Sequence, residues 1–446
     1  MMDITRRKWF HMLSGAACLS RLGAVNAMAQ SGAGDYKALV CIFLAGGNDG
    51  HSTVIPQAAA EYNAYKSIRG GMALPDGNAK VLTVTTPAGV PYGLNNGLAA
   101  VHPLWAQGKL AVVANVGMLV RPVTRAEYAA QSVPVPTNLF SHSDQMVQAQ
   151  SGFASPTGGT GWAGRVADAM EPLNAASSFP SSISMAGPAL FGSGSLVQSA
   201  ALIPGFDMEL YGMNPWPQTA ADARKAALQE ILALDSGMAL VQAANKVRRD
   251  ALDLSAMLKS VNTSSPVSTP FPGTGIGRQL LDVAKIIKLR TSTGLRRQVF
   301  FCSLGGFDTH GSQSWMHWDL LRQLSEAMYA FYNATVELGV AGQVTAFTQS
   351  EFGRTLQPSG TGSDHGWGNH QLVMGGAVKG GNLYGRYPVM ALGGPDDAGT
   401  RGAMIPSTSQ DQYAATMASW FGLSGAQLTA VFPNLSKFPV TNLGFV

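Results

Sequence analysis

The chain has 446 residues, of which 46% are hydrophobic and 13% are charged, and 30 Lys and Arg against 26 Asp and Glu give a formal net charge of +4. This composition excludes a largely disordered chain, and the lack of an uncharged apolar run of 18 or more residues excludes a polytopic membrane protein with stable spans. A charge of +4 without a cluster of five or more Lys and Arg is not typical of a nucleic-acid-binding protein.

Residues 1–29 have the features of a twin-arginine signal peptide. The segment Thr5-Arg6-Arg7-Lys8-Trp9-Phe10 precedes a weakly apolar stretch, and Ala27-Met28-Ala29 is a small-x-small cleavage signal. This pattern predicts export by the twin-arginine machinery and a periplasmic or secreted location; an ordinary basic N-terminus or an uncleaved anchor is the alternative. Cleavage would leave Cys41 and Cys302, which lie in apolar runs and are expected as buried thiols.

Short apolar runs rich in β-branched residues recur along the chain. They are continuous rather than alternating, which favours strands buried on both faces of a sheet. The predicted strands are Ala38–Leu44, Lys80–Thr85, Leu110–Val116, Gln298–Leu304, Gln343–Thr348 and Gln371–Met374.

Helical patterns lie between these runs, at Leu98–Gln107, Ala220–Val261, Ile276–Leu289, Trp315–Leu338 and Gln410–Phe421. Alternating strands and helices predict one α/β domain over residues 36–446, with a mostly parallel central sheet and helices on both faces. The region from about 186 to 296 lacks clear strands and is predicted to be a mostly helical insertion.

Acidic and imidazole residues among glycines follow three of the predicted strands, and a further group lies shortly downstream. Ligands bind at the carboxyl ends of the strands in such sheets, so these residues are expected to meet. Carboxylate with imidazole is typical of Zn²⁺ or Mn²⁺ hydrolytic sites, whereas all-oxygen sites suit Ca²⁺ or Mg²⁺. The candidate ligands of a divalent metal are Asp49, Asp308, His310, Glu351, Asp364, His365 and His370.

Each motif also has a purely structural interpretation. The four interpretations are a tight turn at Asn48-Asp49-Gly50, a helix cap at Asp308, a surface pair of Glu351 with Arg354, and a turn at Asp364-His365-Gly366. The four motifs lie at consecutive strand ends of one sheet, and a purely structural role for all four together is less favoured than for any one of them.

The segment Phe140–Gln145 has two compatible interpretations. Ser141 with Asp144 fits a capping box that opens a helix toward Gln150. Alternatively, Ser141 is a nucleophile, because a helix N-terminus beside a metal stabilises an alkoxide and attracts phosphate.

Together, these motifs resemble the bacterial family named domain of unknown function 1501, which is distantly similar to the alkaline phosphatase and sulfatase superfamily. The resemblance runs from about Lys37 to Leu435. It rests on residues 43–50, 161–165, 306–310, 350–355, 364–368, 374–381 and 432–435. It implies an alkaline-phosphatase-like fold more firmly than it implies a function.

The superfamily pattern implies a two-metal site. By this resemblance, Asp49, Asp364 and His365 bind the metal nearer the nucleophile, Asp308 and His310 bind the other metal, and Ser141 matches the nucleophile position.

The chain departs from that pattern at the second metal. Only Thr309 separates Asp308 from His310, where the superfamily usually has three residues, and no histidine follows His370. His370 or Glu351 is the substitute ligand. The sulfatase C-x-P-x-R signature is absent, so the resemblance does not imply formylglycine chemistry.

Two functions follow. The preferred one is an exported metal-dependent hydrolase of phosphate or sulfate esters, acting on a small-molecule or polysaccharide anionic ester. In this function Arg354 clamps the anion, and Asn369 or His142 donates a hydrogen bond to developing charge. Replacing Asp49 or Asp364 with alanine is then expected to abolish metal binding while the fold survives. The alternative is a non-catalytic envelope protein that uses the same scaffold to bind polysaccharide or a partner, which the incomplete second ligand set favours.

Overall fold

The computed structural model describes residues 35–75, 81–156, 159–204, 213, 215–234, 237–264 and 267–446. The predicted signal peptide, residues 1–29, lies outside these ranges. None of the helices within them combines the length and apolar character that a bilayer crossing requires.

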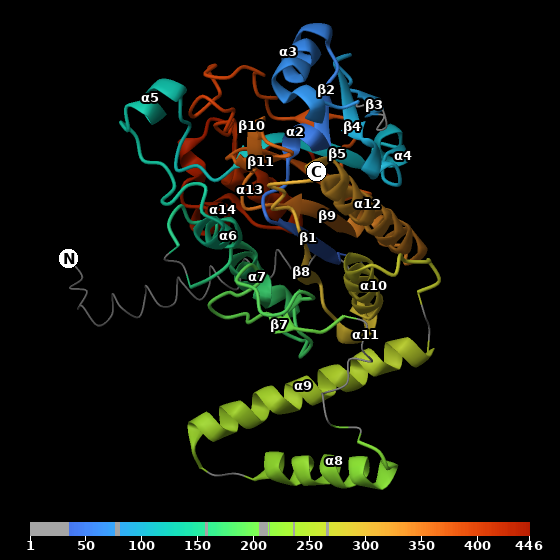
Figure 1. The fold of residues 1–446 in the computed structure, drawn as a ribbon. Coiled ribbons are helices and arrows are strands. Elements are labelled where there is room, and N and C mark those ends of the chain that lie inside the picture. Colours follow the sequence, from blue (N-terminus) through green and yellow to red (C-terminus); the bar gives the residue numbers. More distant parts are fainter. Residues whose placement is uncertain are drawn as a thin grey trace, which may run out of the picture.

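A nine-stranded sheet lies at the centre of the molecule (Figure 1). Its order is β13-β5-β12-β9-β1-β8-β6-β7, and β14 also pairs with β5. The strands are β1 Lys37–Ala45, β5 Leu110–Gly117, β6 Ser182–Ser184, β7 Ala200–Ala201, β8 Arg297–Gly305, β9 Val344–Gln349, β12 Asn369–Gly375, β13 Leu383–Tyr384 and β14 Thr408–Ser409. Among these described strands, β12 alone runs antiparallel to its neighbours β5 and β9.

Helices lie over the sheet and around it. They are α2 Gly50–Thr53, α3 Ala59–Arg69, α4 Pro103–Ala106, α5 Arg125–Ala129, α6 His142–Ser151, α7 Trp162–Asn174, α8 Gln218–Ala233, α9 Ala239–Ser264, α10 Gly275–Lys288, α11 Arg290–Thr293, α12 Gln313–Glu337, α13 Gln410–Phe421 and α14 Gly425–Val431. Short 3₁₀ turns are η1 Gly70–Met72, η2 Asn96–Leu98, η3 Ala341–Gln343 and η4 Leu435–Lys437.

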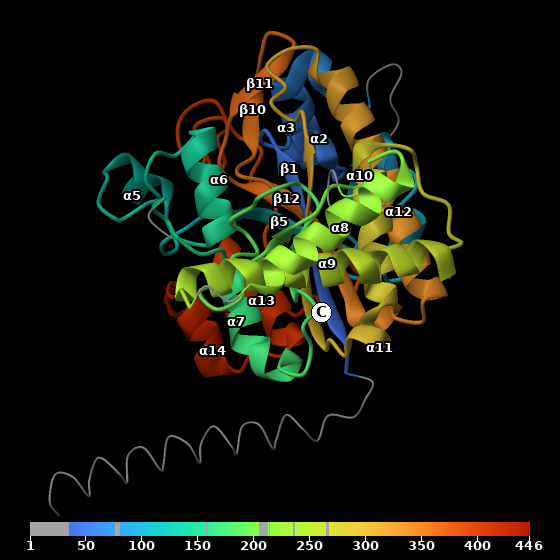
Figure 2. The same cartoon turned by 90° about the horizontal axis from the view of Figure 1, so that it is seen from below.

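Strand β1 shows why both faces of the sheet are covered. Alternate side chains of a strand point to opposite faces. Val40 and Ile42 pack into a core with α10 and α12, whereas Leu39 and Cys41 pack into a second core with α7 and α13. Figure 2 shows these two helix layers on either side of β1. The predicted α/β class, with a mostly parallel sheet between two helix layers, is confirmed, and Cys41 and Cys302 are buried free thiols as predicted.

Several predicted elements differ in the structure. The run 80–85 forms β3, Val81–Thr85, in a separate antiparallel sheet with β2 Val54–Pro56 and β4 Pro91–Asn95. The pattern 98–107 is divided between η2 and α4, and Pro103 begins α4 because proline suits a first helical position.

The predicted insertion, 186–296, contains α8 to α11 and also β7 at the sheet edge. The single long helix predicted over Ala220–Val261 is wrong, because α8 and α9 are two helices and Gly237 between them has a φ of +66°. Figure 1 shows α8 and α9 away from the central sheet.

Candidate metal centre

The loops that follow β1, β8 and β9 meet at one edge of the sheet, because parallel strands end at the same edge. Gly46, after β1, has a φ of +117°, and a Cβ there would lie 2.3 Å from the backbone nitrogen of Asp308. Its amide donates to Oε1 of Glu351 at 2.8 Å. A residue without a side chain is therefore required where the three loops cross.

Three histidines converge on one carboxylate oxygen at this edge. Oδ1 of Asp308 lies 2.9 Å from Nε2 of His310, 3.4 Å from Nε2 of His142 and 3.6 Å from Nε2 of His365. The Nε2 atoms of His310 and His365 are 3.1 Å apart. We call these four residues the histidine group.

The other ring nitrogen of each histidine has an acceptor beside it. Nδ1 of His142 lies 2.9 Å from Oε1 of Glu351, and Nδ1 of His365 lies 2.7 Å from the carbonyl oxygen of Phe140. Such acceptors hold the proton on Nδ1 and leave the Nε2 lone pair for a metal. Nε2 of His142 is buried and has no hydrogen-bond partner among the described residues.

The spacing of three of these ligand atoms, those of His142, Asp308 and His365, fits a single cation. Metal–ligand bonds of about 2.0–2.1 Å at tetrahedral angles hold ligand atoms roughly 3.3 Å apart. Four of the six separations between ligand atoms in the histidine group lie between 2.9 and 3.6 Å. Among the described residues, only His142, Asp308 and His365 have all their ligand atoms within 4.8 Å of one another, so His310 is the outlying member of the group.

The ionised carboxylate and the neutral His365 ring agree with this arrangement, whereas the raised pKa of His142 favours its protonated form, which does not bind a cation. Partial burial acts to raise the pKa of Asp308, but His310 and Arg354 outweigh it, so the pKa is lowered and the carboxylate is ionised. The hydrogen bond to Glu351 raises the pKa of His142 against the opposing effect of burial. Burial lowers the pKa of His365, which keeps that ring neutral near pH 7.

Ser141 lies directly before His142 and caps α6. Its Oγ accepts a hydrogen bond from the amide of Asp144 and donates to Oδ2 of Asp144 at 2.7 Å. Ser141 is therefore confirmed as the N-cap residue, but its own amide donates to the carbonyl oxygen of Asn138, so the reciprocal bond of the predicted capping box is not formed. The role of Ser141 as a nucleophile stays a prediction. Phe140, just before it, has a φ of +73°, a strained value for a large side chain, and turns its carbonyl to His365.

Arg354 has a different role from the predicted anion clamp. Its side chain is 0% exposed, and its guanidinium donates to the carbonyl oxygens of Ser363 and Gly46 and to Oδ1 of Asp308. Because these donors are already used, Arg354 positions Asp308. The predicted surface pair with Glu351 is also wrong, since both side chains are buried.

Asp364 links the histidine group to an exposed cation. Its Oδ1 lies 3.4 Å from Nδ1 of His310, and its Oδ2 lies 2.5 Å from Arg401, whose side chain is 45% exposed. Asp364 and His365 belong to β11, Gly362–His365, which pairs with β10, Arg354–Ser359, so the predicted turn there is wrong. The predicted cap at Asp308 is wrong as well, because Ser312 is the N-cap residue of α12.

Asp49 lies in a separate, fully buried network. Its carboxylate forms an ion pair with Arg69 and accepts from Gln313, and its Oδ1 also accepts from the amide of His51 at 3.0 Å. Burial acts to raise the pKa of Asp49, but Arg69 and His51 outweigh it and hold that pKa well below its usual range. The guanidinium of Arg69 thus balances the charge of the Asp49 carboxylate in a buried ion pair.

His370 is also outside the histidine group. Its Nδ1 accepts from the amide of Asn115 at 3.1 Å, its ring stacks on Tyr387, and burial lowers its pKa to about 3. The grouping implied by the superfamily, Asp49 with Asp364 and His365 on one metal, is therefore not present; His365 lies with Asp308 and His310 instead.

Sequence reasoning missed two residues. Arg69 ends α3, where a basic residue is common because of the helix dipole, so nothing in the pattern marks it as the partner of Asp49. Arg401 lies in a loop with no motif around it, and only the structure brings it to Asp364.

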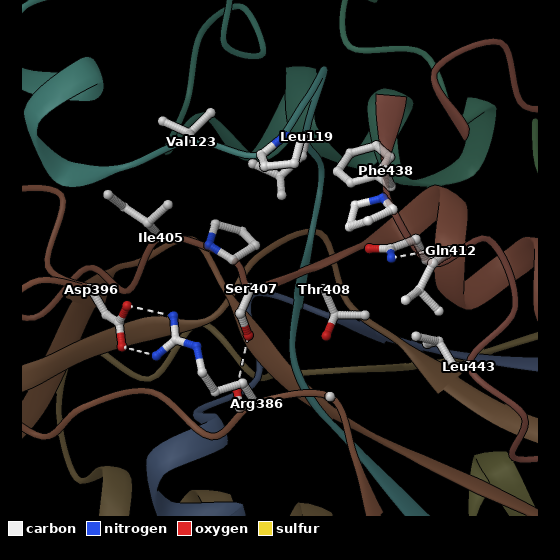
Figure 3. A pocket seen from close by; sticks show the side chains of 15 residues that line it. Leu119, Val123, Arg386, Asp396, Ile405, Ser407, Thr408, Gln412, Phe438 and Leu443 are labelled. Carbon is white, nitrogen blue, oxygen red and sulfur yellow. Dashed lines mark hydrogen bonds and ion pairs between the residues drawn. The ribbon is translucent and has the colours of Figure 1, made fainter. Parts of the chain in front are cut away.

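A pocket of about 520 Å³ contains none of the histidine group (Figure 3). Leu119, Val123 and Phe438 line one side of it, and the ion pair of Arg386 with Asp396 lines another. Its lining has no candidate ligand, so it is not part of the metal centre.

A model of the family described as protein of unknown function DUF1501 matches residues 36–431. The chain belongs to this family. No match to this DUF1501 member was found among curated proteins.

Three solved structures are similar to this DUF1501 chain at low identity. Ps i-CgsB in complex with k-i-k-neocarrahexaose has a TM-score of 0.35 and 9% identity, covering 88% of this chain and 74% of that chain. The PsFucS1 sulfatase from Pseudoalteromonas sp. has a TM-score of 0.31 and 9% identity, covering 82% and 66%. A mutant of alkaline phosphatase PafA has a TM-score of 0.28 and 11% identity, covering 72% and 64%.

Proposed function

We propose that this DUF1501 protein is a metal-dependent hydrolase of phosphate or sulfate esters with a single divalent cation. The observation that carries the proposal is the convergence of three Nε2 atoms on Oδ1 of Asp308. Three imidazoles and one carboxylate favour Zn²⁺ over Ca²⁺ or Mg²⁺, which prefer all-oxygen sites.

His142, His310, His365 and Asp308 would hold the cation. When bound, such a cation polarises an ester oxygen and lowers the pKa of a bound water. Glu351 keeps His142 in the tautomer that leaves Nε2 free, and Arg354 fixes the position of Asp308. Arg401 is the exposed guanidinium joined to the group through Asp364, and it is better placed than Arg354 to attract an anionic ester.

One cation is proposed rather than two because the Asp49 carboxylate already has Arg69 as its counter-charge. A guanidinium in place of a second metal ion also favours the second function, a non-catalytic envelope protein that binds polysaccharide with or without the cation.

Metal analysis and turnover separate these functions. The purified protein is loaded with Zn²⁺, Mn²⁺, Ca²⁺ or Mg²⁺, and its bound metal is measured together with hydrolysis of p-nitrophenyl phosphate, bis-p-nitrophenyl phosphate and p-nitrophenyl sulfate. The proposal expects about one bound ion, turnover of at least one ester, and loss of both in His142→Ala and His365→Ala. His102→Ala, a histidine bonded to Thr83 outside the group, is the matched control. Metal binding without turnover would favour the non-catalytic function, and equal metal in all variants would exclude the site.

We also propose that residues 1–29 direct the protein through the twin-arginine machinery to the periplasm or beyond. Cell fractionation of the wild type and of Arg6→Lys/Arg7→Lys tests this, and an unchanged distribution would contradict it.

A further inference from the structure

A second pocket, of about 580 Å³, lies beside the histidine group. Residues of its lining include Arg69, Met72, Ser312, Ser314, Trp315 and Thr361. None of them belongs to the histidine group, and no part of the proposed ester chemistry uses the pocket.

The pocket and the histidine group share one wall. The amide of Ser312 donates to Oγ1 of Thr361 at 3.0 Å, and a Cβ on Gly362 would lie 2.2 Å from the backbone of His310. Ser312 is two residues from His310, so their Cα atoms are at most about 7 Å apart. A molecule bound in the pocket therefore has its neighbouring part within reach of the histidine group.

Trp315 is an aromatic surface in the pocket lining. It is 66% exposed, although tryptophan is highly buried on average. Its ring stacks on Trp318 with centroids 5.2 Å apart and an interplanar angle of 28°, which orders the indole without covering it. An ordered, exposed indole offers a flat apolar face to a ligand.

The remaining lining is mostly apolar, with Met72 and Pro358, but it includes hydroxyl groups and carries no net charge. Ser312, Ser314 and Thr361 bring hydroxyl groups, and the charge of Arg69 is balanced by Asp49. A sugar ring, which has an apolar face and a rim of hydroxyl groups, matches this combination of apolar surface and hydroxyls.

We infer that this pocket binds a sugar ring and that the ester hydrolysed at the histidine group is carried on a polysaccharide. One face of the ring packs on Trp315, its hydroxyls pair with the serine and threonine hydroxyls, and the sulfate or phosphate on the same chain lies at the histidine group. The part of the inference that concerns the ester rests on the proposed hydrolase function. Sugar binding does not rest on it, because the residues that line the pocket are not those of the histidine group.

A glycan microarray with neutral, sulfated and phosphorylated oligosaccharides tests the inference, using metal-loaded wild type, Trp315→Ala and Trp315→Phe. Trp216→Ala is the matched control, since Trp216 is 93% exposed and does not line the pocket. We expect the wild type to bind a subset of the glycans, Trp315→Ala to lose at least tenfold in signal, and Trp315→Phe and Trp216→Ala to stay within about threefold. Circular dichroism should be the same for all four proteins.

Hydrolysis of p-nitrophenyl esters is measured in parallel, because a small ester does not need the pocket and Trp315→Ala should leave it unchanged. Ester turnover without glycan binding, or glycan binding that Trp315→Ala does not weaken, would overturn the sugar pocket while the hydrolase stands. Glycan binding that depends on Trp315, without turnover of any ester or of the bound glycans, would support the pocket and overturn the hydrolase.

Discussion

Nδ1 of His142 lies 2.9 Å from Oε1 of Glu351, whose side chain is fully buried. The same oxygen accepts the amide of Gly46, so the loop after β1 fixes the carboxylate and the carboxylate fixes the ring. A buried acceptor behind a metal-binding histidine sets its tautomer and raises its basicity. Glu351 thereby acts on the proposed centre without being one of its four ligands.

Glu351→Gln should weaken metal binding by about 10- to 100-fold, as the loss of an outer carboxylate typically does. The side-chain amide of the glutamine still accepts a hydrogen bond from His142, but it lacks the negative charge that raises the basicity of the ring. Competition with a fluorescent chelator measures this affinity, and Glu326→Gln, at an exposed position on α12, is the control. Equal affinity in both variants would show that Glu351 only supports the fold.

Asp49→Asn should lower the free energy of unfolding by about 3–5 kcal/mol, because it leaves the buried guanidinium of Arg69 without its counter-charge. The metal content should equal that of the wild type. This expectation differs from the one drawn from the sequence, in which loss of Asp49 removes the metal and leaves the fold intact. Urea denaturation and metal analysis test both parts. The double variant Asp49→Leu/Arg69→Met should be more stable than Asp49→Asn, and a loss of metal without loss of stability would contradict the ion-pair role.

Arg354→Met should reduce both stability, by about 3–5 kcal/mol, and metal affinity. It removes a buried cation that holds Asp308 and leaves the carbonyls of Ser363 and Gly46 without donors. Arg401→Met, at an exposed position, should change stability by less than about 1 kcal/mol and raise the KM for an anionic ester. If Arg354→Met were as stable as the wild type and only raised KM, Arg354 would be the anion clamp after all.

Asp411 should make stability depend on pH. Burial raises its pKa to about 7 from an ordinary 3.8, against the opposing charges of Arg165 and Lys437. Between these values the unfolded chain has lost the proton and the folded chain keeps it, so stability falls as pH rises. The loss between pH 5 and pH 8 is about 3 kcal/mol at 1.36 kcal/mol per pH unit.

Asp411→Asn resembles the protonated acid and should lack this part of the pH dependence. Urea midpoints at pH 5, 6, 7 and 8 for both proteins give the comparison. Parallel curves would mean that Asp411 is ionised in the folded protein.

The strands that carry the site were predictable, because β1, β8 and β9 are continuous apolar runs and parallel strands end at one edge. From this alone, Asp49, Asp308, His310 and Glu351 were expected to meet. Asp308 and His310 are in contact, whereas Glu351 contacts His142 and Asp49 pairs with Arg69. His365 was predicted in the same site, but its place on a hairpin strand was not, since β11 has only four polar residues and no apolar pattern.

The partners of Asp49 and the role of His142 were not predictable. Asp49 closes β1 as a ligand would, but its charge is balanced by Arg69, twenty residues away on another element. His142 was predicted as a hydrogen-bond donor, whereas the structure puts its Nε2 in the histidine group, because the left-handed turn at Phe140 directs the start of α6 toward β11. Contacts between residues so far apart in the chain cannot be predicted from the local spacing of residue types.

The two thiols in the middle of the sheet offer a practical measurement. Cys41 and Cys302 lie on the neighbouring strands β1 and β8, and burial raises the pKa of both. With Cys18 replaced by serine, a maleimide dye would react only after these central strands separate. The labelling rate would then report how often the protein opens at its centre, with and without bound cation, and without any engineered probe.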